Sequence, residues 1–296
     1  MEISGDTVRK LKLITLAEDF AGYSTEFHAQ HGICFLLEIE DENGEKKNIL
    51  FDTGTDAQPI FHNAEILGVD LKQLDTIFLS HCHYDHTGGL IPIMQFIDNE
   101  NVPIIAHPDI FRLNLSSSPY LRHAGIGGNV RKRAEELGGL WILTDDPLKL
   151  TAGVATTGEI PPEDRIKLER SSEYNAFTIE GDKKLEEDRM LDDVSLAADT
   201  PKGLVVITGC SHAGIASIVK KCKNMMGARD VEAVIGGFHL LHADRRKIEK
   251  LIEELKNMGV RNIYTGHCTG LNAECALKEE FGEKFHKLHC GMKVQF

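Results

Sequence analysis

The chain has 296 residues and a formal net charge of −13, an acidic balance that argues against nucleic-acid binding, which requires clustered lysine and arginine. No run approaches the roughly 18 apolar residues that span a bilayer, and residues 1–6 lack the basic start of a secretory signal, so we expect a cytoplasmic protein without membrane attachment. Seven cysteines, an odd and scattered set, exclude a disulfide scaffold.

The first third of the chain alternates residues that favour strands with polar turns. The strands predicted there are residues 10–16, 32–40, 47–52 and 76–80, and the predicted helices are 57–67 and 90–97. The third strand ends in a Phe-Asp-Thr-Gly turn that contains Asp52, and a cluster of histidines follows the fourth strand directly. Polar side chains are therefore expected at two strand ends.

Between residues 108 and 200 the periodic signal weakens. We expect a loop at 115–119, a short charged helix at 131–137 and a solvated charge run at 181–189. The whole stretch, at about 108–200, is predicted to be an insertion that covers a pocket in a single domain of residues 1–296.

Regular alternation of strands and helices resumes after residue 200. The predicted strands are 203–208, 231–237, 261–265 and an edge strand at 293–296, and the predicted helices are 214–222, 243–258 and 272–281. In the second of these helices the apolar positions fall on one face. Because sites in layered α/β folds gather at the carboxyl ends of strands, the turns after these strands are the places to look for functional side chains.

The cluster after the strand at 76–80 reads His81-Cys82-His83-Tyr84-Asp85-His86. In an extended segment His81 and His83 project to the same side and Cys82 to the other. Asp85 and His86 follow as the chain turns into the next helix, and a Gly-Gly pair lets the backbone pass close by. Imidazole and carboxylate together suit Zn²⁺, Fe²⁺ or Mn²⁺. The cluster therefore predicts a divalent-metal site.

The segment 80–89 resembles the HxHxDH-x-G-G signature of the metallo-β-lactamase superfamily. The resemblance implies an α/β (α+β) fold, a four-layer αββα sandwich with two mixed sheets face to face, and two divalent ions at one edge. Zinc is expected, with iron, manganese or magnesium as alternatives. The first ion would be bound by His81 and His83, and the second by Asp85 and His86. In the oxygen reductases of the superfamily a glutamate occupies the position of His83. The histidine at this position therefore favours non-redox chemistry.

Three glycine-marked turns further along provide the remaining candidates, at residues 208–212, 236–240 and 264–270. We expect His212 to be the third ligand of the first metal and His267 the closing ligand of the second. Cys210 either ligates metal or is an inert buried thiol. His239 either binds metal or contacts substrate. By the same resemblance, Asp52 supports the ligands through a hydrogen bond.

The order and the amino-acid sequences of these turns resemble those of one branch of the superfamily. Its members are described as metal-dependent hydrolases similar to the dihydropterin-aminobenzene-phosphate synthase of methanopterin biosynthesis. From it we predict a hydrolase in which metal-bound hydroxide attacks an ester, lactone or phosphoester of a small molecule. Asp85 would steer the proton, and His212 or His239 would assist the leaving group. Tyr84 is a candidate for substrate contact, with packing as the alternative.

Two other functions remain open. One is a transferase that joins a dihydropterin-methyl diphosphate to a ribosyl-aminobenzene phosphate, and Arg122, Arg131 or Lys132 near the metals would favour such a substrate. The other is a non-catalytic metal-binding sensor. Residues 192–196 depart from the branch, because they lack the glutamine of its DDQAL-like run. The sequence predicts neither a macromolecular partner nor an oligomeric state.

Overall fold

The structure, a computed structural model, describes residues 7–117, 120–168, 176–180, 184–227 and 230–296. The first six residues, used above against a secretory signal, lie outside the described residues. The strand-forming segments at the start of the chain form an antiparallel meander, which is part of a seven-stranded mixed sheet. Its strands, in spatial order, are β18 (Lys293–Gln295), β1 (Val8–Ala17), β2 (Cys34–Asp41), β3 (Lys46–Phe51), β4 (Thr76–Phe78), β5 (Val102–Ala106) and β8 (Gly139–Leu143). The predicted edge strand is confirmed, because β18 pairs with β1.

A second seven-stranded sheet packs against the first. Its strands, in spatial order, are β17 (Phe285–Lys287), β16 (Val260–Gly266), β15 (Val231–Gly237), β14 (Gly203–Ile207), β13 (Leu196–Thr200), β10 (Val154–Thr156) and β9 (Lys149–Thr151). The strands from β14 to β17 are parallel, as are those from β3 to β8 in the first sheet. Each sheet therefore gathers the carboxyl ends of its parallel strands at one edge.

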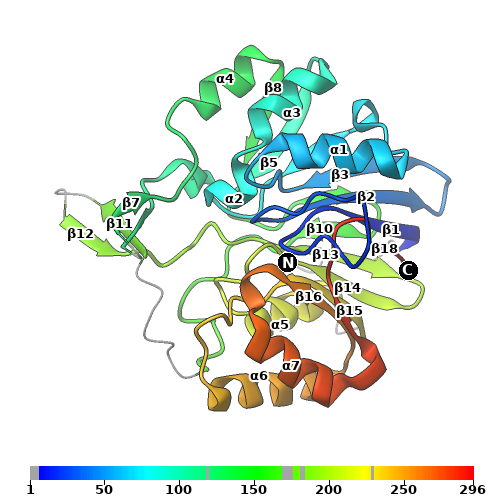
Figure 1. The fold of residues 1–296 in the computed structure, drawn as a ribbon, viewed down its shortest axis with the longest axis vertical. Helices are drawn as coiled ribbons and strands as arrows, with labels where there is room; N and C mark the ends of the chain where they lie inside the picture. The colour runs from blue at the N-terminus through cyan, green and yellow to red at the C-terminus, as the bar shows by residue number, and fades with distance from the viewer. Residues whose placement is uncertain (1–6, 118–119, 169–175, 181–183, 228–229) are drawn as a thin grey trace.

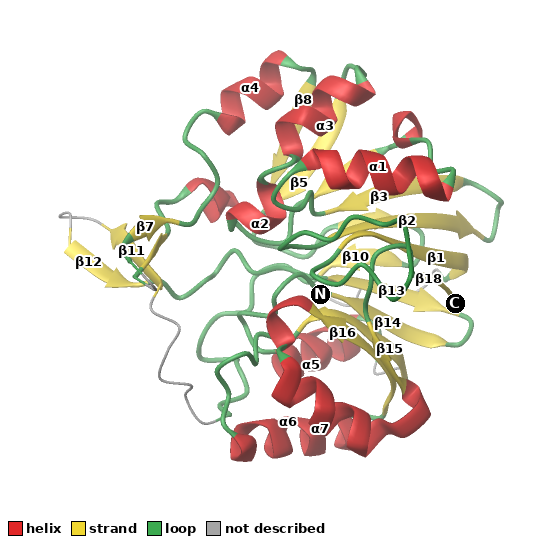
Figure 2. Ribbon diagram, in the orientation of Figure 1, coloured by secondary structure: helices red, strands yellow, loops and turns green. Residues whose placement is uncertain are grey.

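Helices cover the outer faces of both sheets (Figure 1, Figure 2). They are α1 (Ala57–Leu67), α3 (Leu90–Ile97) and α4 (Val130–Glu136) on the first sheet, and α5 (Ile215–Met225), α6 (Arg245–Asn257) and α7 (Leu271–Phe281) on the second. Shorter helices are α2 (Tyr84–Thr87) and the 3₁₀ turns η1 (Leu71–Gln73), η2 (Pro108–Phe111), η3 (His267–Thr269) and η4 (Gly282–Lys284). The predicted αββα sandwich is confirmed. None of the helices in the described ranges is long and apolar enough to cross a bilayer.

Burial of apolar side chains explains this layering. Phe51 of β3 and Phe78 of β4 lie between the sheets, with ring centroids 5.1 Å apart, in a cluster that includes Ile235 of β15. On the outer side, the predicted apolar face of α6 is buried against the second sheet. Local signals set the helix ends, as in α1. There the Asp56 side chain accepts the N–H of Gln58 at the start.

The residues from 108 to 200 are distributed over three sheets. β8 belongs to the first sheet and β9, β10 and β13 to the second, as given above. A small third sheet projects at one side (Figure 2) and consists of β6 (Leu115–Ser116), β7 (Arg122–His123), β11 (Ala176–Glu180) and β12 (Lys184–Glu187). The loop predicted at 115–119 is wrong at its first two residues, which form β6, while 118–119 lie outside the described residues. Residues 181–183 of the predicted charge run also lie outside them, and a pocket-covering role for this range stays a prediction.

Candidate metal centre

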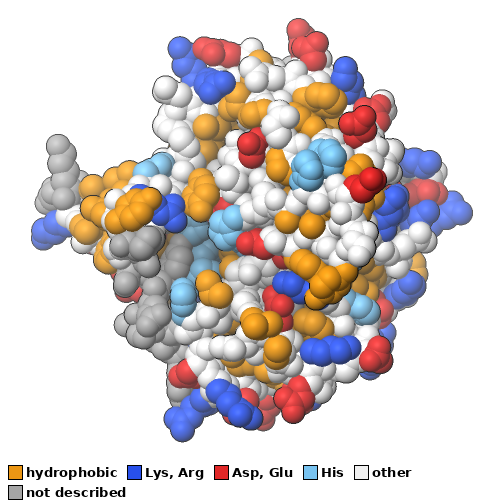
Figure 3. Space-filling view, in the orientation of Figure 1, with side chains coloured by type: hydrophobic (Ala, Val, Ile, Leu, Met, Phe, Trp, Pro, Cys, Tyr) orange, Lys and Arg blue, Asp and Glu red, His pale blue; other side chains and the backbone are white. Residues whose placement is uncertain are grey.

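The candidate site lies where five strands from the two main sheets end. Asp52 follows β3 and His81 follows β4, while Cys210, His239 and His267 follow β14, β15 and β16. Parallel pairing brings these ends together at one edge of each sheet, and the packing of the sheets brings the two edges together. Figure 3 shows histidine side chains gathered in a hollow of this face.

His81, His83 and His212 form the first group of donors. Nε2 of His81 lies 3.1 Å from Nδ1 of His83. The ring centroid of His212 lies 4.8 Å from that of His81 and 4.9 Å from that of His83. Burial lowers the pKa of His83 to about 4, and it lowers the pKa values of His81 and His212 well below the usual range. All three imidazoles are therefore neutral near pH 7 and can offer lone pairs to a cation.

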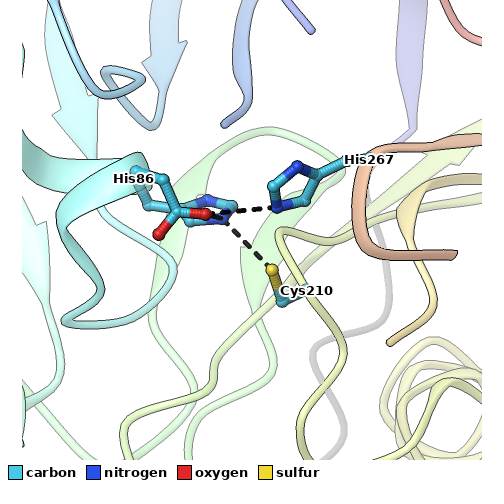
Figure 4. Close-up of side chains that lie close together, drawn as sticks. His86, Cys210 and His267 are labelled. Atoms are coloured by element: carbon cyan, nitrogen blue, oxygen red, sulfur yellow. Dashed lines mark hydrogen bonds and ion pairs between the residues drawn. The ribbon is translucent and has the colours of Figure 1, made fainter. Parts of the chain in front are cut away.

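Asp85, His86, Cys210 and His267 form the second group, and their donor atoms all lie within 4.8 Å of one another. Nε2 of His86 lies 3.2 Å from Sγ of Cys210 (Figure 4), and Nε2 of His267 lies 3.3 Å from Oδ2 of Asp85. Cys210 also clusters with His81 and His212, so its sulfur stands between the two groups. Burial raises the pKa of the Cys210 thiol, and a bound cation would lower it again.

Two carboxylates form hydrogen bonds with Nδ1 of two of these histidines. Oδ2 of Asp52 lies 2.6 Å from Nδ1 of His86, and Oδ2 of Asp19 lies 2.6 Å from Nδ1 of His267. Both contacts leave Nε2 of the ring facing Oδ2 of Asp85, at 3.5 and 3.3 Å. Hydrogen bonds of this kind set the orientation and tautomer of metal-binding histidines. The supporting contact of Asp52 was predicted, whereas that of Asp19 was not.

The donor set suits a divalent cation. Imidazole nitrogens, a carboxylate and a thiolate are the ligands that Zn²⁺ uses in proteins, and histidines backed by carboxylates are the usual arrangement around such ions. The Gly-Gly pair acts as expected, because a Cβ on Gly88 or Gly89 would collide with the carbonyl oxygen of Thr55 or Thr53. The residues therefore fit a metal centre, and the assignment of individual ligands stays a prediction.

His239 lies beside the first donor group, as its ring centroid is 4.3 Å from that of His212. It also clusters with Cys210 and Cys268. Although burial opposes it, hydrogen bonding from Cys210 and the charge of His267 lower the pKa of Cys268. The sequence did not single out Cys268, although it follows His267 directly in one of the three glycine-marked turns. Its proximity to His239 became evident only when the strand ends were brought together.

Tyr84 is half-buried on α2, within the metal-site motif. The guanidinium of Arg122, on β7, lies 5.2 Å from the centroid of its ring. Of the three basic residues considered above, Arg122 thus reaches the surroundings of the site. Arg131 and Lys132 pair instead with glutamates of their own helix, α4, where all four side chains are exposed.

Sequence patterns pointed to neither Asp19 nor His31. Asp19 bridges two histidines, because its Oδ1 lies 2.8 Å from Nδ1 of His31 while its Oδ2 contacts His267. Nε2 of His31 lies 3.3 Å from Oδ2 of Asp85. Both residues belong to the connection between β1 and β2, which has no helix or strand and hence no periodic pattern. The available signal was an acidic Glu18-Asp19 pair immediately after an apolar strand.

Two buried aspartates connect loops of the site through hydrogen bonds and an ion pair. Asp192 accepts a hydrogen bond from the backbone N–H of Cys82 at 2.7 Å and forms an ion pair with Arg112 at 2.8 Å. Asp193 accepts the backbone N–H of Ala213 at 2.8 Å, in the turn that contains Cys210. The side chain of Cys82 packs in the apolar cluster beneath the helices, which confirms that it faces away from its histidine neighbours.

Comparison with known proteins agrees with this geometry. Residues 31–186 match the model of the metallo-β-lactamase superfamily. The chain is 46% identical to the 7,8-dihydropterin-6-methyl-4-(β-D-ribofuranosyl)-aminobenzene-5′-phosphate synthase of Methanocaldococcus jannaschii, over 98% of each chain. It is 30% identical to an uncharacterized protein of the same organism, over 90% of this chain and 94% of that one. A crystal structure of a metal-dependent hydrolase of the β-lactamase superfamily matches with a TM-score of 0.78 and 26% identity, covering 96% of this chain and 98% of that one.

These similarities correct one prediction and confirm others. The relative with 46% identity is named as a synthase in pterin chemistry, so the predicted hydrolysis of an ester, lactone or phosphoester is wrong. The predicted superfamily and fold are confirmed. Together with the clustered donors, they imply that the chain binds divalent metal. The chain is therefore an enzyme that belongs to the metallo-β-lactamase superfamily.

Proposed function

We propose that the chain is a transferase that joins a dihydropterin-methyl diphosphate to a ribosyl-aminobenzene phosphate. The observation that supports this most directly is the 46% identity to the synthase, which extends over 98% of both chains. Arg122 beside Tyr84 adds support, because a phosphate-bearing substrate is best bound where a cation lies near the metal site. Both substrates are small molecules, in keeping with the net charge of −13.

The proposed reaction exchanges one bond for another without oxidation. The aromatic amine nitrogen attacks the methylene carbon attached to the pterin ring, and a C–N bond forms. The bond from that carbon to the diphosphate oxygen breaks, and diphosphate leaves with the electron pair. The nitrogen then loses one proton. The site must therefore neutralise charge on a departing diphosphate and accept one proton.

For the first task we propose two Zn²⁺ ions in the two donor groups. The ligands of the first would be His81, His83 and His212, and those of the second Asp85, His86 and His267, with Cys210 available to either. When bound, the ions would supply positive charge against the leaving diphosphate oxygens. Asp52 and Asp19 would keep the rings of His86 and His267 turned towards that position.

For the second task we propose His239. It lies beside His212 and lines an adjoining cavity, and an imidazole nitrogen is a suitable proton acceptor near neutral pH. Asp85 and His212, also considered as catalytic from the sequence, are proposed here as ligands alone. Tyr84 presents an aromatic ring next to Arg122, a suitable surface for a flat pterin.

The test is a direct synthesis. Zinc-loaded protein incubated with the two substrates should form the condensed pterin and an equal amount of diphosphate, both measured by liquid chromatography and mass spectrometry. A chelator should stop the reaction and zinc should restore it. His83→Ala should abolish product, whereas His62→Ala, on α1, should leave it unchanged. Absence of condensed pterin with the metal-loaded wild-type protein would refute the proposal.

A further inference from the structure

A cavity of about 450 Å³ opens beside the first donor group, within the size range of small-molecule sites. Its lining includes Ser211, His212 and His239, so the cavity adjoins the candidate metal centre. Residues of the segments 162–168 and 187–190, together with residues of α5 and α6, form much of the remaining wall. A molecule in this cavity would therefore have one end at the reacting atoms.

Several side chains that line the cavity are apolar. Leu168 is half-buried. Four further side chains that line the cavity are buried members of the apolar cluster between the second sheet and its helices, namely Ile215, Phe238, Leu240 and Leu251. Such walls favour an unsubstituted hydrocarbon or benzene ring, because burial of apolar surface is favourable. They disfavour a pterin, whose ring edge has several donors and acceptors that would be left without hydrogen bonds.

Basic side chains line the same cavity, from Arg165, Arg189 and Lys247. Arg165 is held in place by three backbone carbonyls, those of Ile160, Arg189 and Met190, at 2.8 to 3.1 Å. A guanidinium has five N–H donors. Among the described residues these three are the partners of Arg165, so two donors of a fixed cation remain for a ligand.

The two acidic residues that line the cavity, Glu187 and Asp188, are not among the hydrogen-bond partners of Arg165 in the described part of the chain, since its three hydrogen bonds go to backbone carbonyls. Asp188 lies 2.8 Å from Arg112 and 2.8 Å from the side-chain amide of Asn114, so its charge is already paired. Glu187 is exposed on β12. Within the described part of the chain, Arg165 and Arg189 form no ion pair with a carboxylate. Arginines of this kind bind phosphate oxygens through charge-assisted hydrogen bonds.

We infer that this cavity binds the ribosyl-aminobenzene phosphate. The benzene ring would lie against Phe238 and Leu251, and the amine would point to His239. The phosphate would contact Arg165, Arg189 and Lys247, the basic residues that line the cavity. The inference rests on the proposed function for the identity of the ligand, and it adds which of the two substrates occupies which side of the metal centre. The dihydropterin-methyl diphosphate would then occupy the side of Tyr84.

The test compares binding of two probes to the zinc-loaded protein by calorimetry. These are ribosyl-aminobenzene phosphate and the same compound without its phosphate. Arg189→Gln and Lys247→Gln should each raise the Kd of the phosphorylated probe about tenfold, as expected for loss of a charged hydrogen bond. Neither should change the Kd of the dephosphorylated probe or of dihydropterin-methyl diphosphate. Lys250→Gln, on the same helix but not lining the cavity, is the matched control.

The outcomes separate this inference from the proposed function. If wild-type protein forms condensed pterin but both variants bind the phosphorylated probe as wild type does, the cavity assignment is overturned and the function stands. It is also overturned if the variants weaken only the pterin diphosphate. If the variants behave as expected but no condensed pterin forms, the assignment stands and the transferase proposal fails.

Discussion

Oδ2 of Asp19 lies 2.6 Å from Nδ1 of His267, although 248 positions separate the two residues. Asp19 follows β1 of the first sheet and His267 follows β16 of the second, so this hydrogen bond joins the two halves of the site. Although burial opposes it, the neighbouring Cys268, Asp19 and Asp85 raise the pKa of His267. The contact directs Nε2 of His267 towards Asp85 and hence towards the proposed second metal.

Replacing Asp19 should weaken metal binding. In Asp19→Ala the ring of His267 loses the carboxylate that orients it, and loss of such a partner typically lowers metal affinity by roughly 10- to 100-fold. Competition with a chromogenic zinc chelator measures the change. Asp146→Ala, at an exposed turn, should bind zinc as wild type does. Equal zinc affinity in Asp19→Ala and wild type would show that the contact does not support the ligand.

Replacing Asp52 should reduce the stability of the metal-free protein. Asp52 is fully buried and accepts hydrogen bonds from the backbone N–H and hydroxyl of Ser80 and from His86. Asp52→Asn places an amide N–H₂ against one of these donors and leaves it unsatisfied, at a cost of about 1–3 kcal/mol. Urea unfolding in the presence of a chelator measures this loss apart from metal binding. An unchanged unfolding midpoint would contradict it.

The role of Cys210 can be decided spectroscopically. Its sulfur stands between the two donor groups, so cobalt-substituted protein should show thiolate-to-cobalt absorption that disappears in Cys210→Ser. Cys275→Ser, with an exposed thiol on α7, should retain the band. Persistence of the band in Cys210→Ser and its loss in Cys268→Ser would assign the thiolate to Cys268 instead.

Arg112 should contribute to stability through its ion pair with Asp192. The side chain of Asp192 is fully buried and that of Arg112 is 15% exposed. Arg112→Ala leaves a buried charge without its partner, a loss on the order of 3–5 kcal/mol in the free energy of unfolding. Adding Asp192→Asn should recover part of it, because the amide oxygen can still accept the N–H of Cys82. A loss below about 1 kcal/mol in the single variant, by urea unfolding, would be inconsistent with this account.

Helices and strands with a clear hydrophobic period were predictable from the sequence. The bounds of α1, α3 and β15 are those predicted, because a long apolar stripe or run is a local property of the chain. The two-residue strands β6 and β7 were not predictable, because two residues have no measurable period. They are strands because they pair with each other and because β6 also pairs with β11, some 60 residues later.

The same division applies to the site. The sequence by itself determined the six-residue metal motif, because its donors lie within six consecutive residues and their spacing is local. It also determined the three glycine-marked turns that contain His212, His239 and His267. Only the tertiary structure decided that Asp19 and His31 join them, and that Cys210 stands between the two donor groups. These contacts arise because parallel strands of two packed sheets end at a common edge, and the distance across that edge is not a function of separation along the chain.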